Sequence, residues 1–518
     1  MKHNPSLISR SPKIKKILLA VLSGAAAFAA FPPLGFSIAA WIAFVPLFFV
    51  VKNTGYKGAF WYSLLCGVVF WGSVLYWLTN VSVPGFFMVV LLMAGFYALF
   101  GLMVKLAMKY SMNLFAVSFA WVVLEYCRAH FLTGFPWAIL GYSQYTNINI
   151  IQVADISGAY GVSFLIVVFN VAVYAWVSGN KRKVSYMMVA LLFIVCSTSY
   201  GIYRIGNPIT GETAKISVIQ GNISQALKWD AFAAGDIVDK YSGLTLKAAM
   251  DEPDIIIWPE TSYPYLMEYG DSFTTEMEEL AVKTGIPIVA GAVYKEGEAY
   301  YNSAILFEPA GGSEMYRKIH LVPFGEYVPF EEHLVSLRKY IDKPIGSFVS
   351  GKEYKIFPVR SARESVGPDS SLIRRTVFHK MGVMICFEDV FPYIARNFVS
   401  EGARILVNIT NDAWFGDTAA SRQHLQASVF RAVENRVPVA RAANTGISCF
   451  IDINGKINSQ VISGGREIFV DGWDTYEVKT TSLKSYYTVY GDMFVYFSGV
   501  FLILVIISGY FSSVKKHA

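Results

Sequence analysis

The stretch Met381-Gly-Val-Met-Ile-Cys-Phe-Glu-Asp389 places a cysteine directly after five apolar or small residues and directly before two carboxylates. An apolar run of this length predicts a buried strand, and Glu388, Asp389 and Pro392 are typical of the first turn of a helix. A cysteine on such a turn lies near helix N-terminal amides, which favour its thiolate. The stretch therefore makes Cys386 a candidate nucleophile, with a buried structural cysteine as the alternative.

Around this stretch, residues 203–491 have a globular composition and predict an α/β layered domain, because short apolar runs alternate with helical patterns. The expected strands are 216–220, 255–258, 288–292, 303–307, 383–386 and 405–409. The expected helices lie near 231–250, 273–284, 391–401 and 421–435. Residues 361–374 predict a mobile surface loop, and residues 328–350 predict either an amphipathic lid or a long packed loop.

Two further stretches carry polar groups that suit a cysteine nucleophile. Ile255-Ile-Ile-Trp-Pro-Glu260 ends a strand with a carboxylate, at the sheet edge where open α/β folds place their sites. Tyr316 to Pro329 places Lys318 and Glu326 in a loop rich in proline, glycine and aromatic residues. Taken singly, Glu260 is typical of a solvated cap and Lys318 of a surface lysine. Together with a thiol they supply a base, a cation and a nucleophile.

The chain as a whole is too apolar for an ordinary soluble protein. It is 54% hydrophobic and 15% aromatic, and its 16% of charged residues is well below the roughly 25% of a typical soluble domain. Apolar runs near the length of a membrane span lie at 17–31, 34–51, 58–78, 85–104, 113–127, 161–178, 184–202 and 492–511. The sequence therefore predicts eight transmembrane helices, in a membrane domain over 1–202 and a C-terminal helix and tail over 492–518.

The basic residues predict an orientation. With eight spans both chain ends lie on one side, where Lys and Arg cluster, and the positive-inside rule makes that side the cytoplasm. The large segments 128–160 and 203–491 are then extracytoplasmic. The alternative is that the first run is a cleaved signal peptide, which would place the basic ends on opposite faces.

A second polar feature lies at the start of segment 128–160. Glu125 and Arg128 are three residues apart on one helical face and are expected to pair near the membrane interface. The segment is either an interfacial anchor with aromatic belt residues or a lip that receives a lipid head group or the soluble domain. His424 and the other histidines are scattered and fit structural or interfacial positions.

The ordered motifs Trp258-Pro-Glu260, Tyr316-Arg-Lys-Ile-His-Leu-Val-Pro-Phe-Gly-Glu326 and Ile385-Cys-Phe-Glu388 resemble the Glu-Lys-Cys triad of the nitrilase superfamily. The chain as a whole is similar to the membrane-bound branch of that superfamily, the apolipoprotein N-acyltransferases. Gln220 to Trp229, Thr133 to Trp137 and Asn408 to Gly416 support the resemblance, which covers nearly the whole chain.

The resemblance implies an α-β-β-α sandwich beside an eight-helix membrane part. Carried over by motif, Cys386 is the nucleophile, Glu260 the general base and Lys318 the oxyanion stabiliser, and Glu326 orients the site. It also implies that Trp229, Phe387 and Glu388 shape the substrate pocket, the last two beside the nucleophile. Phe387 stands where many members are expected to have tyrosine, so only its backbone N–H remains as an oxyanion donor.

The resemblance further implies an enzyme that moves an acyl chain from a membrane phospholipid, through a thioester on Cys386, to the α-amine of a lipoprotein's diacylglyceryl-cysteine. The expected place is the bacterial inner membrane, with the catalytic domain facing the periplasm. Two alternatives are a membrane-tethered amidase with the same triad and a non-catalytic lipoprotein-binding module. No cofactor is expected, and the sequence contains no phosphate loop, nucleic-acid groove or metal cluster.

Overall fold

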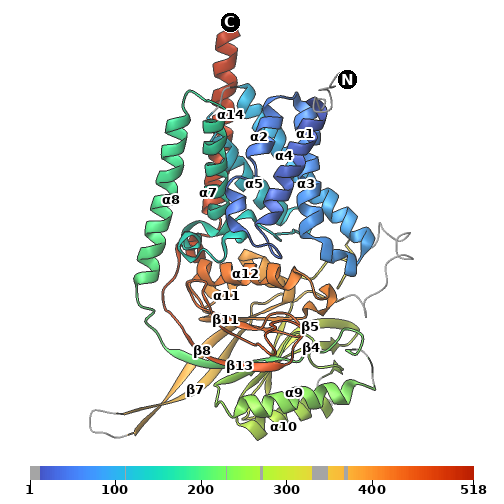
Figure 1. Ribbon diagram of the computed structural model, residues 1–518. Coiled ribbons are helices and arrows are strands. Elements are labelled where there is room, and N and C mark those ends of the chain that lie inside the picture. The colour runs from blue at the N-terminus through green and yellow to red at the C-terminus, as the bar shows by residue number, and fades with distance from the viewer. Residues whose placement is uncertain are drawn as a thin grey trace, which may run out of the picture. The chain divides into compact units, whose positions relative to one another are not determined.

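The computed structural model describes residues 12–110, 113–228, 230, 232–268, 272–329, 348–366 and 372–517. They group into two compact units, which are described here one at a time (Figure 1). Unit 1 comprises the chain up to Gly206 together with Thr418–Gln426 and Asp492 onward, and unit 2 comprises Asn207–Asp417 and Ala427–Gly491. The domain limits expected from the sequence remain predictions.

Unit 1 is helical. Its elements are α1 (Pro12–Ala29), η1 (Ser37–Trp41), α2 (Val45–Lys52), α3 (Tyr56–Val74), η2 (Tyr76–Asn80), α4 (Val83–Lys109), α5 (Ala116–His130), η3 (Leu140–Gln144), α6 (Ile148–Ile151), α7 (Ala154–Val177), α8 (Lys183–Gly206) and α14 (Met493–His517). Each expected apolar run contains helix. In the described residues, four helices are long and apolar enough to cross a membrane, namely α4, α7, α8 and the part of α14 up to Phe511. A membrane protein is supported, and the count of eight spans remains a prediction.

The run at 34–51 differs from the single span expected there. It forms the 3₁₀ helix η1, a turn and the short helix α2, because Pro46 lies in the first turn of α2 and favours a new helix start. The break frees backbone groups, and the buried side chain of Asn170 satisfies two of them. Its amide donates to the carbonyl of Ala40 at 2.9 Å and its oxygen accepts from the N–H of Phe44 at 2.8 Å. Irregular backbone in an apolar unit needs such internal partners.

Residues 418–426 group with unit 1 although they lie far along the chain. Gln423 is 4% exposed, and its oxygen accepts hydrogen bonds from the indoles of Trp77 and Trp137, both at 3.0 Å. Its nitrogen donates to the carbonyls of Pro32 and Val74 at 2.9 and 3.1 Å. The segment is therefore fixed in unit 1 by a glutamine whose polar atoms all have partners.

Unit 2 contains two sheets. In the residues described, the first has the order β13-β1-β2-β4-β5-β6, with β3 also on β4, and the second has the order β12-β11-β10-β9-β8-β7. The strands of the first sheet are β1 (Thr213–Gln220), β2 (Ile255–Ile257), β3 (Leu266–Met267), β4 (Ile288–Glu296), β5 (Ala299–Phe307), β6 (Ser313–Arg317) and β13 (Gly472–Lys479). The strands of the second are β7 (Ile356–Val366), β8 (Leu372–Ile385), β9 (Ile405–Thr410), β10 (Val439–Ala443), β11 (Cys449–Ile451) and β12 (Ile457–Gln460).

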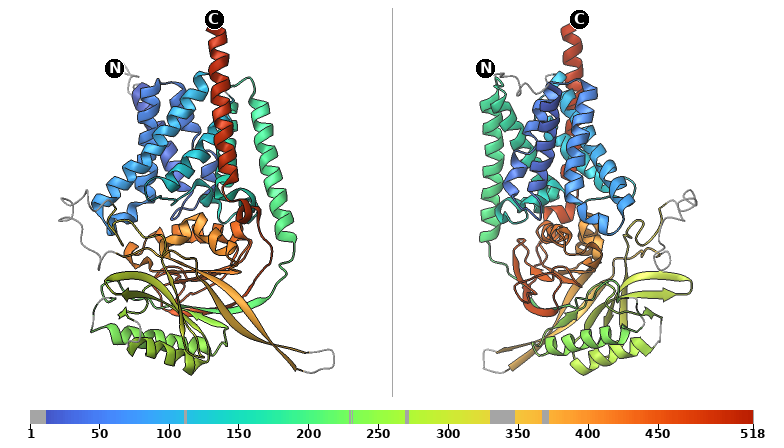
Figure 2. Two further views of the ribbon diagram at one scale, coloured as in Figure 1. Left: turned by 180° about the vertical axis from the view of Figure 1, so that it is seen from behind. Right: turned by 45° about the vertical axis from the view of Figure 1, so that its right-hand side comes forward.

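The two sheets pack face to face through β1 and β10, and helices cover their outer faces (Figures 1 and 2). α9 (Ala234–Ala249) and α10 (Ser272–Thr284) lie on the first sheet, where Tyr241 stacks on Trp258 in the core. α11 (Pro392–Ser400) lies on β8 and β9 of the second sheet. The remaining elements are η6 (Cys386–Val390), η7 (Asp412–Phe415), α12 (Ala420–Asn435) and α13 (Tyr486–Tyr490). The predicted α-β-β-α sandwich is confirmed.

The prediction of a mobile loop over 361–374 is wrong where the structure describes it. Residues 361–366 and 372–374 belong to the paired arms of β7 and β8, which extend from the sheet as a long hairpin (Figure 2). Only residues 367–371 lie outside the described part. Most of the segment 328–350, predicted as a lid or a packed loop, also lies outside the described residues.

Candidate active site

Glu260 is held just beyond the end of β2. It is 6% exposed, and each carboxylate oxygen has a fixed donor. Oε1 accepts from the side-chain amide of Asn302 at 2.8 Å, and Oε2 accepts from the backbone N–H of Asn411 at 2.9 Å. These donors come from β5 and from the end of β9, so both sheets orient the carboxylate.

Lys318 directly follows β6 and is 1% exposed. Its backbone N–H donates to the carbonyl of Asn302, and its Nζ lies 2.9 Å from Glu326 Oε1 and 3.6 Å from Glu260 Oε1. Burial alone lowers the pKa of Lys318, but the charges of Glu326, Glu260 and Cys386 outweigh it and raise the pKa above its usual value. Lys318 is therefore a permanent cation at neutral pH and suits electrostatic stabilisation rather than proton transfer.

Glu326 shares its partners with Glu260. Its Oε1 accepts from Lys318 and from the side-chain amide of Asn302 at 2.7 Å, and its Oε2 accepts from the N–H of Val322 at 2.7 Å. One amide nitrogen thus holds both carboxylates beside one ammonium. This agrees with an orienting role for Glu326.

Cys386 begins η6 at the end of β8. Its φ of 53° lies in the left-handed region, and its carbonyl accepts from the side-chain amide of Asn408 at 3.0 Å. A strained conformation held by neighbours is common at functional sites. The charges of Glu260 and Lys318 both act on the half-buried thiol, so the structure brings the three candidate triad residues together.

The expectation that this turn favours the thiolate is wrong for the resting protein. Burial raises the pKa of Cys386 well above its usual value, and the Glu260 charge adds to the effect while Lys318 opposes it. The cost of desolvating the thiolate exceeds the stabilisation that Lys318 and the short 3₁₀ turn give it. Nucleophilic attack therefore needs a base that takes the thiol proton as the bond forms.

Glu388 is fully buried and anchors the loop that carries Lys318 to the turn that carries the cysteine. Its Oε1 accepts from Tyr316 Oη and the N–H groups of Ile319 and His320, and its Oε2 accepts from the N–H of Ile385 at 2.7 Å. Burial raises the pKa of Glu388 to about 7, although these donors oppose the shift. Its predicted contact with substrate remains a prediction.

The two aromatic residues predicted at the pocket have different outcomes. Phe387 is half-buried, and its ring centre lies 5.2 Å from that of Phe391 and 6.3 Å from that of His320. It thus belongs to an aromatic wall next to the cysteine. Trp229 lies outside the described residues, and its predicted role is untested.

A buried charge network below the cysteine was missed from the sequence. Arg441 donates from Nη1 to Asp389 at 3.0 Å and to Asn408 Oδ1 at 2.7 Å, and its Nη2 lies 3.4 Å from Asp412. Because Asn408 also holds the Cys386 carbonyl, this network fixes the nucleophile's backbone. The available signal was the presence of polar residues within the otherwise apolar strands β9 and β10.

Metal chemistry has no candidate site in the residues described, where no cluster of three His, Cys, Asp or Glu side chains could hold an ion. The five cysteines all lie in the described part and form no disulfide with one another.

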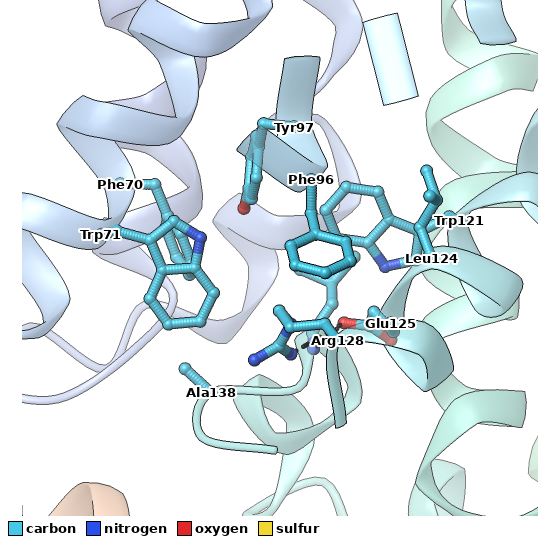
Figure 3. Close-up of a pocket in the computed structure, with 10 residues that line it drawn as sticks. Phe70, Trp71, Phe96, Tyr97, Trp121, Leu124, Glu125, Arg128 and Ala138 are labelled. Atoms are coloured by element: carbon cyan, nitrogen blue, oxygen red, sulfur yellow. Dashed lines mark hydrogen bonds and ion pairs between the residues drawn. The ribbon is translucent and has the colours of Figure 1, made fainter. Parts of the chain in front are cut away.

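Unit 1 has a small pocket of its own, shown in Figure 3. Arg128 points toward Glu125 there, with 4.0 Å between Nη2 and Oε1, and stacks over Trp71 at 4.9 Å. Arg128 also donates to the carbonyls of Phe135 and Trp137. The predicted pair is thus formed, in a setting where both side chains are buried and support the chain turn that follows α5.

The sandwich and the Glu-Lys-Cys cluster define unit 2 as a nitrilase-superfamily domain. The family model described as carbon-nitrogen hydrolase matches residues 215–471. Among solved structures, Saccharomyces cerevisiae Nit3, a nitrilase-superfamily member, aligns at 17% identity and TM-score 0.38 over 53% of this chain and 92% of that one. A carbon-nitrogen hydrolase from Helicobacter pylori aligns at 16% identity and TM-score 0.37 over 52% and 90%.

The membrane part narrows this class to one family. A model described as the apolipoprotein N-acyltransferase N-terminal domain matches residues 23–172. The apolipoprotein N-acyltransferase of Geobacter metallireducens is 37% identical over 502 residues, which are 92% of each chain. That of Pasteurella multocida is 30% identical over 98% of this chain and 97% of the relative. The chain belongs to the apolipoprotein N-acyltransferase family and is an acyltransferase of the nitrilase superfamily.

Proposed function

We propose that the protein transfers an acyl chain from a membrane phospholipid to the α-amine of an apolipoprotein's N-terminal diacylglyceryl-cysteine, through a thioester on Cys386. The observation that carries the proposal is that Cys386, Glu260 and Lys318 act on one another within unit 2. The apolar helices of unit 1 supply the membrane platform that two lipid substrates require. The family's name supports a lipoprotein acceptor.

In the first half-reaction, Cys386 Sγ attacks the ester carbonyl while its proton passes to Glu260. The carbonyl electron pair becomes an oxyanion, which the Lys318 ammonium and the Phe387 N–H stabilise. When the oxyanion collapses, the C–O bond breaks, and Glu260 returns the proton to the leaving lysophospholipid. Because the thiol is protonated at rest, this order of events needs no preformed thiolate.

In the second half-reaction, the neutral α-amine of the lipoprotein attacks the thioester and Glu260 takes one of its protons. The C–S bond then breaks, and the departing sulfur recovers the proton. Lys318 keeps its charge through both halves, as its raised pKa requires. We place the reaction at the periplasmic face of a bacterial inner membrane crossed by eight helices, in keeping with the distribution of basic residues.

Intact-mass analysis of the purified full-length enzyme with one defined phospholipid tests the thioester. Wild type gains one acyl chain, Cys386→Ala gains none, and the control Cys196→Ala, which changes an exposed cysteine, behaves as wild type. Adding a diacylglyceryl-cysteine peptide then moves the acyl group to the peptide amine. Full peptide acylation by Cys386→Ala would contradict the scheme. Release of fatty acid or ammonia without peptide acylation would favour the amidase alternative.

A further inference from the structure

Lys228 is a second buried lysine beside the triad, and the mechanism above gives it no task. It lies in the turn between β1 and α9 and is 2% exposed. Its Nζ donates to the backbone carbonyl of Glu260 at 2.9 Å and to Thr261 Oγ1 at 2.7 Å. Its charge also acts on the Glu260 carboxylate and on Cys386. A desolvated ammonium is costly to bury, so its position here calls for a specific explanation.

The backbone that Lys228 holds is strained. Thr261 has a φ of 43°, in the left-handed region that β-branched residues rarely adopt. Such a conformation persists only when its surroundings impose it. Lys228 bonds the carbonyl before the strained residue and the hydroxyl on it, so it contacts the turn where the strain lies.

Gly291 of β4 confines the same turn through its backbone. A Cβ at this position would lie 2.5 Å from the Pro259 carbonyl oxygen, 2.6 Å from the Glu260 Cα and 2.7 Å from the Thr261 nitrogen. The N–H of Gly291 donates to the Pro259 carbonyl at 3.2 Å. The Glu260–Thr261 turn is therefore held on one side by the backbone of Gly291 and on another by the side chain of Lys228.

Asn411 links the turn that contains Lys228 to the Glu260 carboxylate. Gln225 Oε1 accepts from the side-chain amide of Asn411 at 2.9 Å, and the backbone N–H of Asn411 donates to Glu260 Oε2. The turn at 225–228 thus contacts the base through its main chain and through a donor to its carboxylate. Both contacts therefore help to orient the Glu260 side chain.

We propose that Lys228 is a positioning residue that fixes the Glu260–Thr261 main chain and thereby the direction of the Glu260 carboxylate. The inference rests on the proposed role of Glu260 as the base, and it adds a residue that the three motifs do not contain.

The positioning role does not depend on the charge of Lys228. Burial lowers the pKa of Lys228 to about 7, against the opposing charge of Glu260. The ammonium below that pH and the neutral amine above it can both donate to the Glu260 carbonyl and to Thr261, so the positioning remains on either side of it.

The test compares full-length Lys228→Met with Lys247→Met, which removes an exposed lysine from α9. Single-turnover acylation of Cys386 is followed by intact mass over a range of phospholipid concentrations. The rate at saturating phospholipid falls about 10²-fold in Lys228→Met, while the half-saturating concentration changes less than about twofold, because the base and not the lipid site is displaced. Lys247→Met behaves as wild type.

A second readout needs no substrate. Iodoacetamide alkylation of Cys386 at neutral pH, followed on its peptide by mass spectrometry, reports how well the protonated thiol is activated by its base. Because Lys228→Met displaces Glu260, its alkylation rate falls, and that of Lys247→Met stays at the wild-type value. A residue that served only the fold would leave the alkylation rate unchanged in a variant with the wild-type melting temperature.

The outcomes separate the two proposals. If wild type is not acylated but the alkylation rate of Lys228→Met still falls, the proposed function fails and Lys228 keeps its positioning role. If wild type is acylated and folded Lys228→Met matches it in both the acylation and the alkylation rate, the Lys228 inference is overturned. Should Lys228→Met not fold, Thr261→Val decides, since it removes one bond to Lys228 and keeps the β-branched shape. A fall in its saturating rate supports the inference, and an unchanged rate overturns it.

Discussion

Lys318 is the ammonium between two buried carboxylates, and Lys318→Met removes its charge with little change in volume. Two consequences follow, one for catalysis and one for stability. They are measured separately, one as a rate and one as a melting temperature, so together they test the arrangement of the site.

The catalytic consequence is the loss of an oxyanion donor. Removal of one such donor typically costs about 3–4 kcal/mol, or roughly 10²–10³ in rate. Acylation of Cys386 by Lys318→Met is therefore expected at or below about one hundredth of the wild-type rate. Lys318 is 1% exposed and has two carboxylate partners, so no surface lysine is expected to reproduce this loss.

The stability consequence comes from Glu260 and Glu326, which lose their shared cation. Their Oε1 atoms bond the same Asn302 nitrogen at 2.8 and 2.7 Å, so they lie at most about 5.5 Å apart. At an effective dielectric constant of about 20, two unit charges at that distance repel by about 3 kcal/mol. The melting temperature is therefore expected to fall by roughly 5–10 °C.

Thermal unfolding of the detergent-solubilised full-length protein at neutral pH measures the difference in melting temperature between wild type and Lys318→Met.

The double variant Lys318→Met with Glu326→Gln is the matched control. It removes one of the two repelling charges, so it recovers much of the lost stability at neutral pH but none of the lost rate. Lys318→Met with more than about a tenth of the wild-type acylation rate would refute the oxyanion role. A melting-temperature difference that is unchanged in the double variant would refute the shared-cation geometry.

Three further substitutions probe the supporting structure. Glu388→Gln places an amide nitrogen among groups that can only donate hydrogen bonds. One unsatisfied buried group costs about 1–3 kcal/mol. We therefore expect the rate of Cys386 acylation, measured by intact mass, to be lower by about tenfold or more. Gly291→Ala forces the turn that carries Glu260 to move, so the acylation rate of the folded variant is expected to fall about 10²-fold. The control Gly243→Ala adds a methyl group with no atom near it and is expected to leave the acylation rate unchanged. Arg441→Met leaves two buried aspartates without their cation and is expected to destabilise the protein by about 3–5 kcal/mol, seen as a lower melting temperature.

The three candidate triad residues could be predicted from the sequence because each follows an apolar strand run or a dense local motif. Glu260 and Cys386 stand at the ends of β2 and β8, and Lys318 follows β6 by one residue. The resemblance of these motifs to the nitrilase triad grouped the three residues, although Glu260 and Lys318 follow strands of the first sheet and Cys386 follows a strand of the second. The sandwich fold was predictable for the same reason.

The partners of these residues could not be predicted, because they depend on which strands pair and in what register. Asn302 faces Lys318 and both glutamates only because β5 lies between β4 and β6. Asn411 reaches Glu260 across the interface of the two sheets, which no local pattern encodes. Lys228 resembles any loop lysine until its burial is known.

Two segments differ from the sequence prediction because the average composition of a segment does not show how its backbone pairs or where a helix starts. Residues 361–374 are polar and contain glycine and proline, which predicts a loop, yet the arms on either side of the undescribed tip pair as β7 and β8. The run at 34–51 is apolar enough for a span, yet Pro46 starts a new short helix within it. In the first segment the pairing of two strands, and in the second a single proline, had more influence than the average composition.

The charges around Cys386 explain why a buried thiol with a raised pKa suits this chemistry. The Lys318 ammonium lies beside two carboxylates, Glu260 and Glu326. Loss of the thiol proton to solvent would add negative charge next to them in a desolvated site, which is costly. Transfer of the proton to Glu260 during attack keeps the total unchanged, because the oxyanion gains the charge that the carboxylate loses. The thiol is therefore activated when an acyl donor is present to receive the electron pair, and it stays protonated between turnovers.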